Sequence, residues 1–287
     1  MFKCPYCKRA DAVKAGIRKN KGGLKQRFVC QKCEQYFVAD NAFKRFRNKK
    51  EVITVALDLR AKGLSLADIV DHLDQHYRVK VTRKTILDWQ KKFKEKVKGF
   101  VESLTPFVGG IIHADEVFLK VKKEWNYYWD AIDYDTKFVV GEHFSKIREE
   151  QEAMIFLQYI KNHTNQVHVI HTDNSYDYPI PIKKVFGKQV RHVHYPAWKK
   201  KFKNNPIERL QNTIKQRTKT FRSFDNFNTA KDFMEFWKIY YNLIRKHTTL
   251  NFITPAQAAG INLNLQRNRF LSLIEILKNK TTISKTH

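Results

Sequence analysis

The order of hydrophobic and polar residues divides the chain into regions of different periodicity. Between residues 49 and 99, apolar side chains recur every three or four positions, which is the spacing of one helical face. From residue 108 the pattern changes to strand-like runs, GIIHADEVFLKV, EWNYYWDAIDYDT and KFVVGEHFSK, which predict a three-stranded meander. A helical segment, REEQEAMIFLQYIKNH, and a buried strand, QVHVIHTD, are predicted next. The pattern therefore predicts a helical unit followed by an α/β core.

Three helices are expected in the first region, residues 46–100. One helix ends near Gly63, Ser65 caps a short second helix, and Thr82 caps a third, RKTILDWQKKFKEKVK. The third helix buries an apolar face that includes Trp89, and its other face carries the bases Arg83, Lys84, Lys91 and Lys94. This pattern favours a helix-turn-helix unit whose third helix enters the DNA major groove. The alternative is a basic packing helix in a connector.

Before this unit, all four cysteines of the chain lie in two CxxC pairs: Cys4, Cys7, Cys30 and Cys33. Four thiolates at this spacing are typical of a closed, tetrahedral structural zinc site. A disulfide pair or reduced thiols are the alternative. Residues 1–45 are therefore expected to form a zinc ribbon, folded as a two-stranded hairpin around Gly22 and Gly23. The first 50 residues hold 15 Lys or Arg against three acids, which favours DNA as the partner over a protein.

Net charge extends this expectation to the whole chain. The formal charge is +27 at pH 7, and such an excess indicates a polyanionic partner. No long apolar run predicts a membrane span, so we expect no membrane contact and an intracellular, cytoplasmic or nucleoid-associated protein of a prokaryote. The C-terminal residues 263–287 are expected to form an amphipathic tail helix, for which an oligomer contact is one open role.

Three acids stand at positions where a divalent cation is the simplest explanation. Asp115 lies within a predicted strand and Asp173 at the end of another, while Glu208 is the one acid among nine bases between residues 199 and 222. Mg²⁺ prefers oxygen ligands and keeps part of its shell for phosphate. We therefore expect these carboxylates to form one cluster. The alternative for Glu208 is a charge that favours a helix start, because Asn205 and Pro206 are typical of one.

The neighbours of these acids raise further expectations. Glu116 follows Asp115 on the same strand, so the two side chains should face opposite sides and only one of them should join the cluster. Histidines near the acids are a weaker choice for hard cations than carboxylates. Bases around Glu208 are expected to contact DNA, with a solvated basic surface as the alternative: Lys199, Lys200, Lys201, Lys215 and Lys219.

A family resemblance rests on three short sequence motifs and on one spacing. The motifs are HADE, HTDN and NNPIERLQNTIKQRTK, and 34 residues separate Asp173 from Glu208. They resemble DDE insertion-sequence transposases of the IS6 (IS240) type, their archaeal relatives and retroviral-type integrases. The resemblance covers residues 108 to about 260, and TPAQAAGI is similar to the end of many such cores. It implies an RNase H-like core of five strands over residues 108–262. It also implies two Mg²⁺ or Mn²⁺ ions held by Asp115, Asp173 and Glu208, with Asp115 bridging them.

The resemblance implies an enzyme, a DDE transposase. Such an enzyme cuts double-stranded DNA at terminal inverted repeats and joins the freed 3′-hydroxyl to target DNA by transesterification. Because two DNA ends take part, a homodimer or larger synaptic complex is implied. Two alternatives remain open from the sequence. One is a DNA-binding regulator that combines the zinc ribbon and helix-turn-helix with an inactive core, and the other is a viral-type integrase or nuclease.

Overall fold

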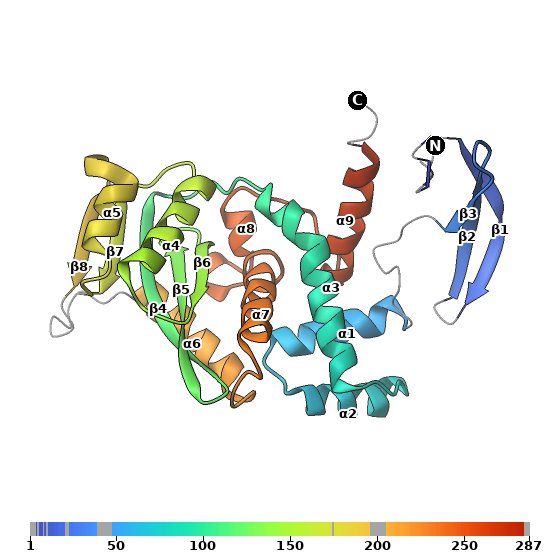
Figure 1. The fold of residues 1–287 in the computed structure, drawn as a ribbon, viewed down its shortest axis with the longest axis horizontal. Coiled ribbons are helices and arrows are strands. Elements are labelled where there is room, and N and C mark those ends of the chain that lie inside the picture. Colours follow the sequence, from blue (N-terminus) through green and yellow to red (C-terminus); the bar gives the residue numbers. More distant parts are fainter. Residues whose placement is uncertain are drawn as a thin grey trace.

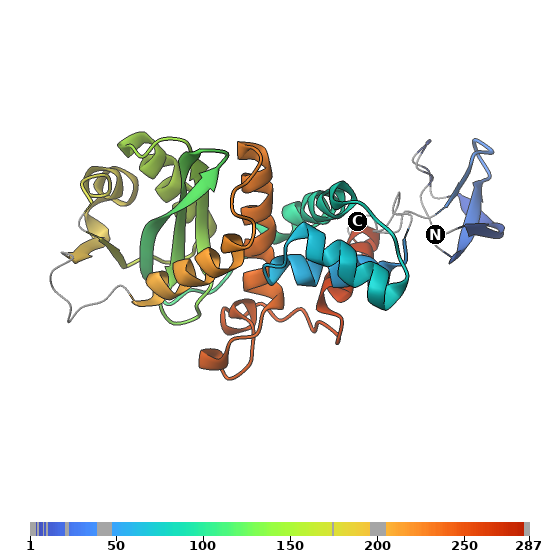
Figure 2. The same ribbon diagram turned by 90° about the horizontal axis from the view of Figure 1, so that it is seen from below.

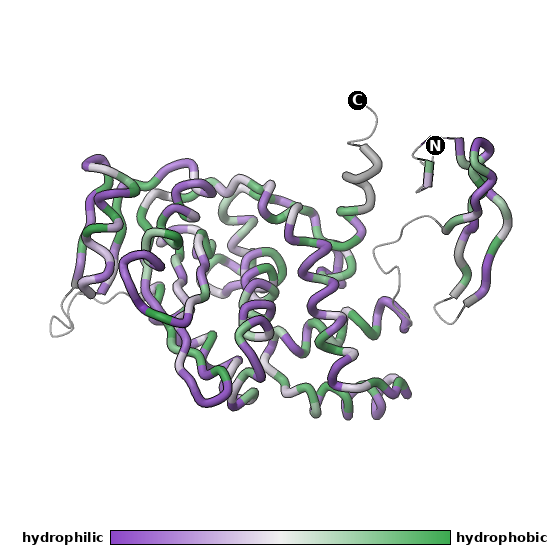
Figure 3. Tube along the Cα trace, viewed as in Figure 1, coloured by the Kyte–Doolittle hydropathy of each residue, from purple (hydrophilic) through white to green (hydrophobic). Residues whose placement is uncertain are grey.

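The structure is a computed structural model, and it describes residues 4, 6, 7, 9, 11–20, 23–38, 48–173, 175–195 and 205–283. A small β-ribbon is followed along the chain by a helical unit and then by a mixed α/β core (Figure 1). Figure 3 shows hydrophobic and hydrophilic residues interleaved along these elements, as expected for elements that bury one face. Within the described residues, no helix is long and apolar enough to cross a membrane.

The N-terminal ribbon is an antiparallel sheet in the order β1-β2-β3. Its strands are β1 (Ala12–Asn20), β2 (Gly23–Cys30) and β3 (Tyr36–Val38). The first two strands form the hairpin that the sequence predicts around Gly23. The core of the ribbon is small and consists of Cys4, Phe28, Cys30 and Phe37. So small a core needs a covalent or metal staple to be stable.

The helical unit consists of α1 (Lys50–Ala61), α2 (Leu66–Tyr77) and α3 (Arg83–Glu102). Ser65 Oγ accepts a hydrogen bond from the backbone N–H of Asp68, and Thr82 Oγ1 accepts one from Thr85, so both predicted caps form. The apolar positions of α3 are buried as expected, and Trp89 belongs to the core.

The C-terminal helix α9 (Arg269–Ile283) packs against α1 and α3. The ring of Phe270 lies 5.2 Å from that of Phe93 in α3 and 6.1 Å from that of Tyr240, measured between centroids. Leu273 and Ile274 are also buried. The apolar face of this helix is therefore covered within the chain, by the helical unit.

The α/β core is built on a five-stranded sheet in the order β6-β5-β4-β7-β8. The first three strands are antiparallel neighbours, whereas β7 and β8 run parallel to β4. The three-stranded meander predicted from the sequence is thus present. The strands are β4 (Ile111–Val121), β5 (Glu124–Asp133), β6 (Val139–Ser145), β7 (Val169–Asp173) and β8 (Arg191–Tyr195).

Helices cover both faces of this sheet, α4 and α5 on one side and α6 and α7 on the other (Figure 2). On the first face, Phe156 and Tyr178 pack against the buried ring of Trp129. The remaining elements are α4 (Glu150–His163), α5 (Pro179–Phe186), α6 (Asn205–Lys219), α7 (Phe227–Ile239), α8 (Pro255–Ala258) and the short 3₁₀- or π-helices η1 (Gly187–Gln189), η2 (Tyr240–Ile244) and η3 (Thr248–Leu250).

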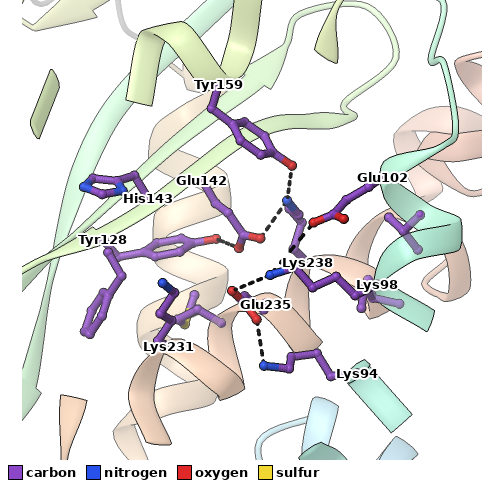
Figure 4. A pocket seen from close by; sticks show the side chains of 14 residues that line it. Lys94, Lys98, Glu102, Tyr128, Glu142, His143, Tyr159, Lys231, Glu235 and Lys238 are labelled. Carbon is purple, nitrogen blue, oxygen red and sulfur yellow. Dashed lines mark hydrogen bonds and ion pairs between the residues drawn. The ribbon is translucent and has the colours of Figure 1, made fainter. Parts of the chain in front are cut away.

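A charged network joins α3 to the core around a cavity of about 220 Å³ (Figure 4). Lys94 forms ion pairs with Asp232 and Glu235 of α7, and it is 8% exposed. On the same helix, Lys238 lies 2.6 Å from Glu142 of β6. The expectation that Lys94 belongs to a DNA-facing surface is therefore wrong, because its charge is matched inside the joint between α3 and α7.

Candidate active site

The candidate site forms where β7 ends beside the middle of β4. The parallel ladder between these strands runs from Ile111–Val169 to His113–His171, two residues before Asp115. Asp173 is the last residue of β7, so it lies level with Asp115 on the neighbouring strand. Carboxylate oxygens of Asp115, Asp173 and Glu116 all lie within 4.8 Å of one another. We call these three residues the carboxylate cluster.

The presence of Glu116 in this cluster corrects the expectation that only Asp115 joins it. Strand alternation does place the two residues on opposite faces, since Asp115 pairs with Asp130 and Glu116 with Trp129 across β4 and β5. However, the ladder to β7 stops at His113, so this edge of β4 is open beside both acids. The Asp115 carboxylate also bends along the strand and accepts a hydrogen bond from the Glu116 N–H at 2.8 Å. Both carboxylates can therefore reach the same edge.

Arg148, which follows β6, offsets part of the charge of the cluster. Its Nε lies 3.2 Å from Glu116 Oε1 and 3.1 Å from Asp177, and its Nη2 lies 3.8 Å from Asp173 Oδ2. One guanidinium thus contacts three carboxylates. It fixes the Glu116 side chain, which is 2% exposed, next to the more open Asp173.

Burial controls the protonation of the cluster. Desolvation, with a smaller contribution from the charge of Asp173, raises the pKa of Asp115 to about 6. Desolvation raises the pKa of Glu116 to about 8, although the nearby Arg148 acts in the opposite direction. The cluster therefore binds a proton at neutral pH when no cation compensates its charge.

A buried acid beside the cluster, Asp130, was missed by the sequence analysis. It lies directly opposite Asp115 on β5 and is 0% exposed. Its Oδ1 accepts a 3.4 Å hydrogen bond from Gln211 of α6, and burial raises its pKa well above the usual value. Its position in the strand-like run EWNYYWDAID was the available signal, because a charged residue inside such a run marks a buried acid.

Glu208 stands on α6, which packs against β4 and β5. It is exposed and lies one helical turn before Gln211, the residue that contacts Asp130. Among the described residues, the structure groups Glu208 with no other acid around a common point. The helix that carries Glu208 thus packs on the face of the sheet that carries Asp115, and Glu208 itself lies outside the carboxylate cluster.

Residues 110–247, which contain all of these acids, match the family described as DDE domain. This region belongs to that family. The five-stranded mixed sheet and this match confirm the α/β, RNase H-like class expected from the sequence. They also support the expected recognition, an IS6-like DDE transposase, and with it a polynucleotidyl transferase or endonuclease.

Two curated relatives are similar over most of the chain. An uncharacterized protein of Methanocaldococcus jannaschii is 26% identical, over 77% of this chain and 100% of its own length. The transposase for insertion sequence-like element IS431mec of Staphylococcus aureus is 25% identical, over 72% of this chain and 90% of its own length. Both alignments extend beyond the DDE domain.

Solved structures similar to this chain include catalytic cores of retroviral integrases. The HTLV-2 integrase catalytic core domain in complex with magnesium is 17% identical, with a TM-score of 0.40 over 54% of this chain and 98% of that one. The catalytic core domain of BIV integrase is 13% identical, with a TM-score of 0.40 over 52% of this chain and 93% of that one.

The donor atoms of the DDE domain fit a hard cation. The carboxylate cluster offers oxygens, which Mg²⁺ and Mn²⁺ prefer. The nearby histidines make other contacts: the rings of His113 and His171 stack 4.6 Å apart, and His192 Nε2 lies 2.8 Å from Thr172 Oγ1. Within the described residues, no histidine belongs to a group that can surround an ion.

Outside the DDE domain, the four cysteines form a second group of metal-binding type. Sulfur atoms lie 3.5 Å apart in the pairs Cys4–Cys33 and Cys7–Cys30, and all four are free thiols. Four thiolates around one zinc ion would be about 3.8 Å apart, given a Zn–S distance of about 2.3 Å. The geometry therefore fits one structural zinc ion.

The predicted DNA-contacting bases are exposed where the structure describes them. Arg83, Lys84 and Lys91 line the outer surface of α3, and Lys215 and Lys219 are exposed on α6. Lys199, Lys200 and Lys201 lie outside the described residues, as does the side chain of Asn205 with its predicted cap. The described bases thus occupy two surfaces, one on the helical unit and one on the DDE domain.

The raised pKa of Glu116 predicts a specific pH dependence of stability. Its folded pKa of about 8 lies above its usual value of 4.5, so the metal-free folded state binds more protons than the unfolded state between these values. Stability must then fall as pH rises through this window. We expect Glu116→Gln to remove part of this loss of stability. At pH 8 the free energy of unfolding of the metal-free variant should therefore exceed that of the wild type by about 2 kcal/mol.

Chemical denaturation at pH 5 and pH 8 in a chelator measures this difference. Asp71→Asn, at an exposed acid of α2, is the matched control and should follow the wild type at both pH values. A Glu116→Gln variant that is less stable than the wild type at pH 8 would show instead that the ion pair with Arg148 dominates.

Proposed function

We propose that this protein is a DNA transposase that cleaves strands at the ends of an element and transfers the freed 3′-hydroxyl to target DNA. The observation that carries this proposal is the meeting of Asp115 and Asp173 where β7 ends beside the middle of β4, inside the matched DDE domain. The carboxylate of Asp115 is desolvated and lies close to that of Asp173, so the two charges repel one another without a cation. Such an arrangement is costly unless it serves to bind one.

Asp115 and Asp173 would hold Mg²⁺ or Mn²⁺, and we propose Glu208 as the third catalytic carboxylate, with Asp115 shared between two ions. When bound, divalent cations lower the pKa of the attacking oxygen and offset charge on the leaving oxygen. The position of Glu208 on α6 supports this role, since Gln211, one turn further along the same helix, contacts Asp130, the residue opposite Asp115.

Exposed bases and the N-terminal ribbon would position the DNA. Lys215 and Lys219 follow Glu208 on α6 and are exposed, so they can pair with phosphates beside the cluster. The zinc ribbon and the surface of α3 with Arg83, Lys84 and Lys91 would bind terminal inverted repeats. Because two DNA ends must be held together, we further propose that the protein acts as a homodimer or larger synaptic complex. We propose the cytoplasm as its location.

Strand cleavage in vitro tests the proposed function. The full chain is incubated with Mg²⁺ or Mn²⁺ and a labelled duplex that carries the sequence flanking its own gene. We expect a nick that leaves a 3′-hydroxyl, followed by joined products when target DNA is present. DNA binding without cleavage under either metal would support a regulator with an inactive core and overturn the proposal.

DNA binding should depend steeply on salt, because the exposed bases of α3 and α6 displace counterions from phosphates. Each phosphate contact contributes about −0.9 to the slope of log K against log salt for duplex DNA. Replacing Lys91 with Gln should therefore reduce the slope by about one, as measured by fluorescence anisotropy. Lys94→Gln is the internal comparison: its charge is matched by Asp232 and Glu235, so the salt slope should stay unchanged.

A further inference from the structure

The hairpin of β4 and β5 extends past α4 and α5 and leaves part of one face uncovered (Figure 1). On this face Phe118 pairs with Tyr127, and Lys120 pairs with Trp125 at the next position. Phe118 is 48% exposed and Trp125 is 59% exposed. We call these four residues the hairpin ladder. Such large rings on a strand normally face a core or a partner.

The rings of the ladder form ordered pairs. Phe118 and Tyr127 lie 5.2 Å apart between centroids, and Lys120 Nζ lies 5.9 Å from the centroid of the Trp125 ring. Lys122 and Lys123 are exposed in the turn that follows. The surface therefore combines aromatic faces with cationic groups along one line.

The opposite face of the hairpin is held firmly to the core. Leu119 and Val121 are buried there, and Phe224 forms a bridge to the hairpin. The Phe224 N–H donates to the Lys120 carbonyl at 3.0 Å, and the Lys122 N–H donates to the Phe224 carbonyl at 2.8 Å. Phe224 follows α6, the helix that carries Glu208, so the ladder is fixed relative to the candidate site.

The ladder also continues the site along the same strand. Alternate residues of β4 share one face, so Glu116, Phe118 and Lys120 stand in a row, separated by about 7 Å per step. Glu116 belongs to the carboxylate cluster. A polymer bound at the cluster and leaving along this face would meet Phe118 first and the pair of Lys120 and Trp125 next.

From this juxtaposition we propose that the hairpin ladder binds unpaired DNA bases next to the cleavage site. The inference rests on the proposed function. Exposed aromatic rings can stack on unpaired bases, whereas bases inside a duplex have their faces covered by their neighbours. The lysines would hold the phosphates of the same strand. The ladder thus fits a frayed or displaced single strand better than an intact duplex.

The test compares two DNA probes that differ only in unpaired bases. The full chain, kept in a chelator so that no strand is cut, binds either a labelled blunt duplex or the same duplex with a short single-stranded thymine extension. We expect the wild type to prefer the extended probe. Trp125→Ala should reduce that preference about five-fold or more and leave affinity for the blunt duplex unchanged. Trp125→Phe should keep most of the preference because it retains a ring.

Tyr134→Ala is the matched control. Tyr134 follows the other end of β5 and is 46% exposed. Lys137 Nζ lies 4.6 Å from the centroid of its ring, so Tyr134 matches Trp125 both in exposure and in having a cation nearby. This variant should keep the wild-type preference. Equal loss in both variants would mean that any exposed aromatic contributes, and would overturn the inference.

Two further outcomes would also overturn it. One is a wild type with no preference for the extended probe. The other is a Trp125→Ala variant that sediments with a different mass but keeps the preference, because the ladder would then contact a second copy of the chain. Either result is compatible with the proposed function if the wild type still binds the blunt duplex and cleaves it with Mg²⁺. Failure of both activities would instead count against the proposed function.

Discussion

Replacing Asp115 with Asn is expected to abolish strand cleavage and strand transfer while the protein stays folded and bound to DNA. The substitution preserves size but removes a charge and a ligand oxygen from the centre of the carboxylate cluster. Loss of cation stabilisation should lower the cleavage rate by about 10³-fold or more. DNA affinity should stay unchanged or increase, because repulsion between the carboxylate and phosphate is reduced.

Glu116→Gln is the control for this experiment, since Glu116 belongs to the same cluster and differs from Asp115 in protonation. With a pKa of about 8, the Glu116 carboxyl already carries a proton at neutral pH in the metal-free state, and Gln imitates that form. Its cleavage rate should therefore fall much less. Both variants are assayed on the labelled end duplex with Mg²⁺. An active Asp115→Asn beside an inactive Glu116→Gln would reverse the proposed roles, and normal cleavage by all carboxylate variants would exclude DDE chemistry.

Removing zinc is expected to unfold the N-terminal ribbon and leave the rest of the chain folded. The ribbon has its own core of four residues, two of them cysteines, so it has little other stabilisation. Structural zinc contributes about 10–16 kcal/mol to the folding of comparable small domains. Cys7→Ser should thus reduce the zinc content from one ion per chain to none and weaken binding to element ends.

Metal analysis and proteolysis measure this outcome together. The wild type should carry one zinc, and protease should cut the Cys7→Ser variant before residue 48 while the DDE domain stays intact. Ser65→Ala, which removes a helix cap in α2, is the comparison: it should lower stability by about 1 kcal/mol and leave the zinc content unchanged. A zinc-free wild type, or a disulfide between the cysteines, would contradict the prediction.

The sequence by itself predicted the features that depend on local spacing. Period-two and helical patterns predicted the meander of β4, β5 and β6 and the buried face of α3, because one buried face imposes its period on the residues. Ser65 and Thr82 predicted two helix starts, since a cap needs only its own first turn. The paired spacing of the cysteines likewise predicted a metal site within one short segment.

Only the tertiary structure decided which distant charges meet. Alternation along β4 wrongly predicted that only one of Asp115 and Glu116 joins the cluster, because it contains no information on where the neighbouring strand β7 ends. The sequence placed Lys94 on the basic face of α3, whereas in the structure it pairs with Asp232 and Glu235 of α7. Asp130 and the hairpin ladder depend on cross-strand register and on which helices cover the sheet. These are properties of packing between segments far apart in the chain, and local patterns of polarity do not encode them.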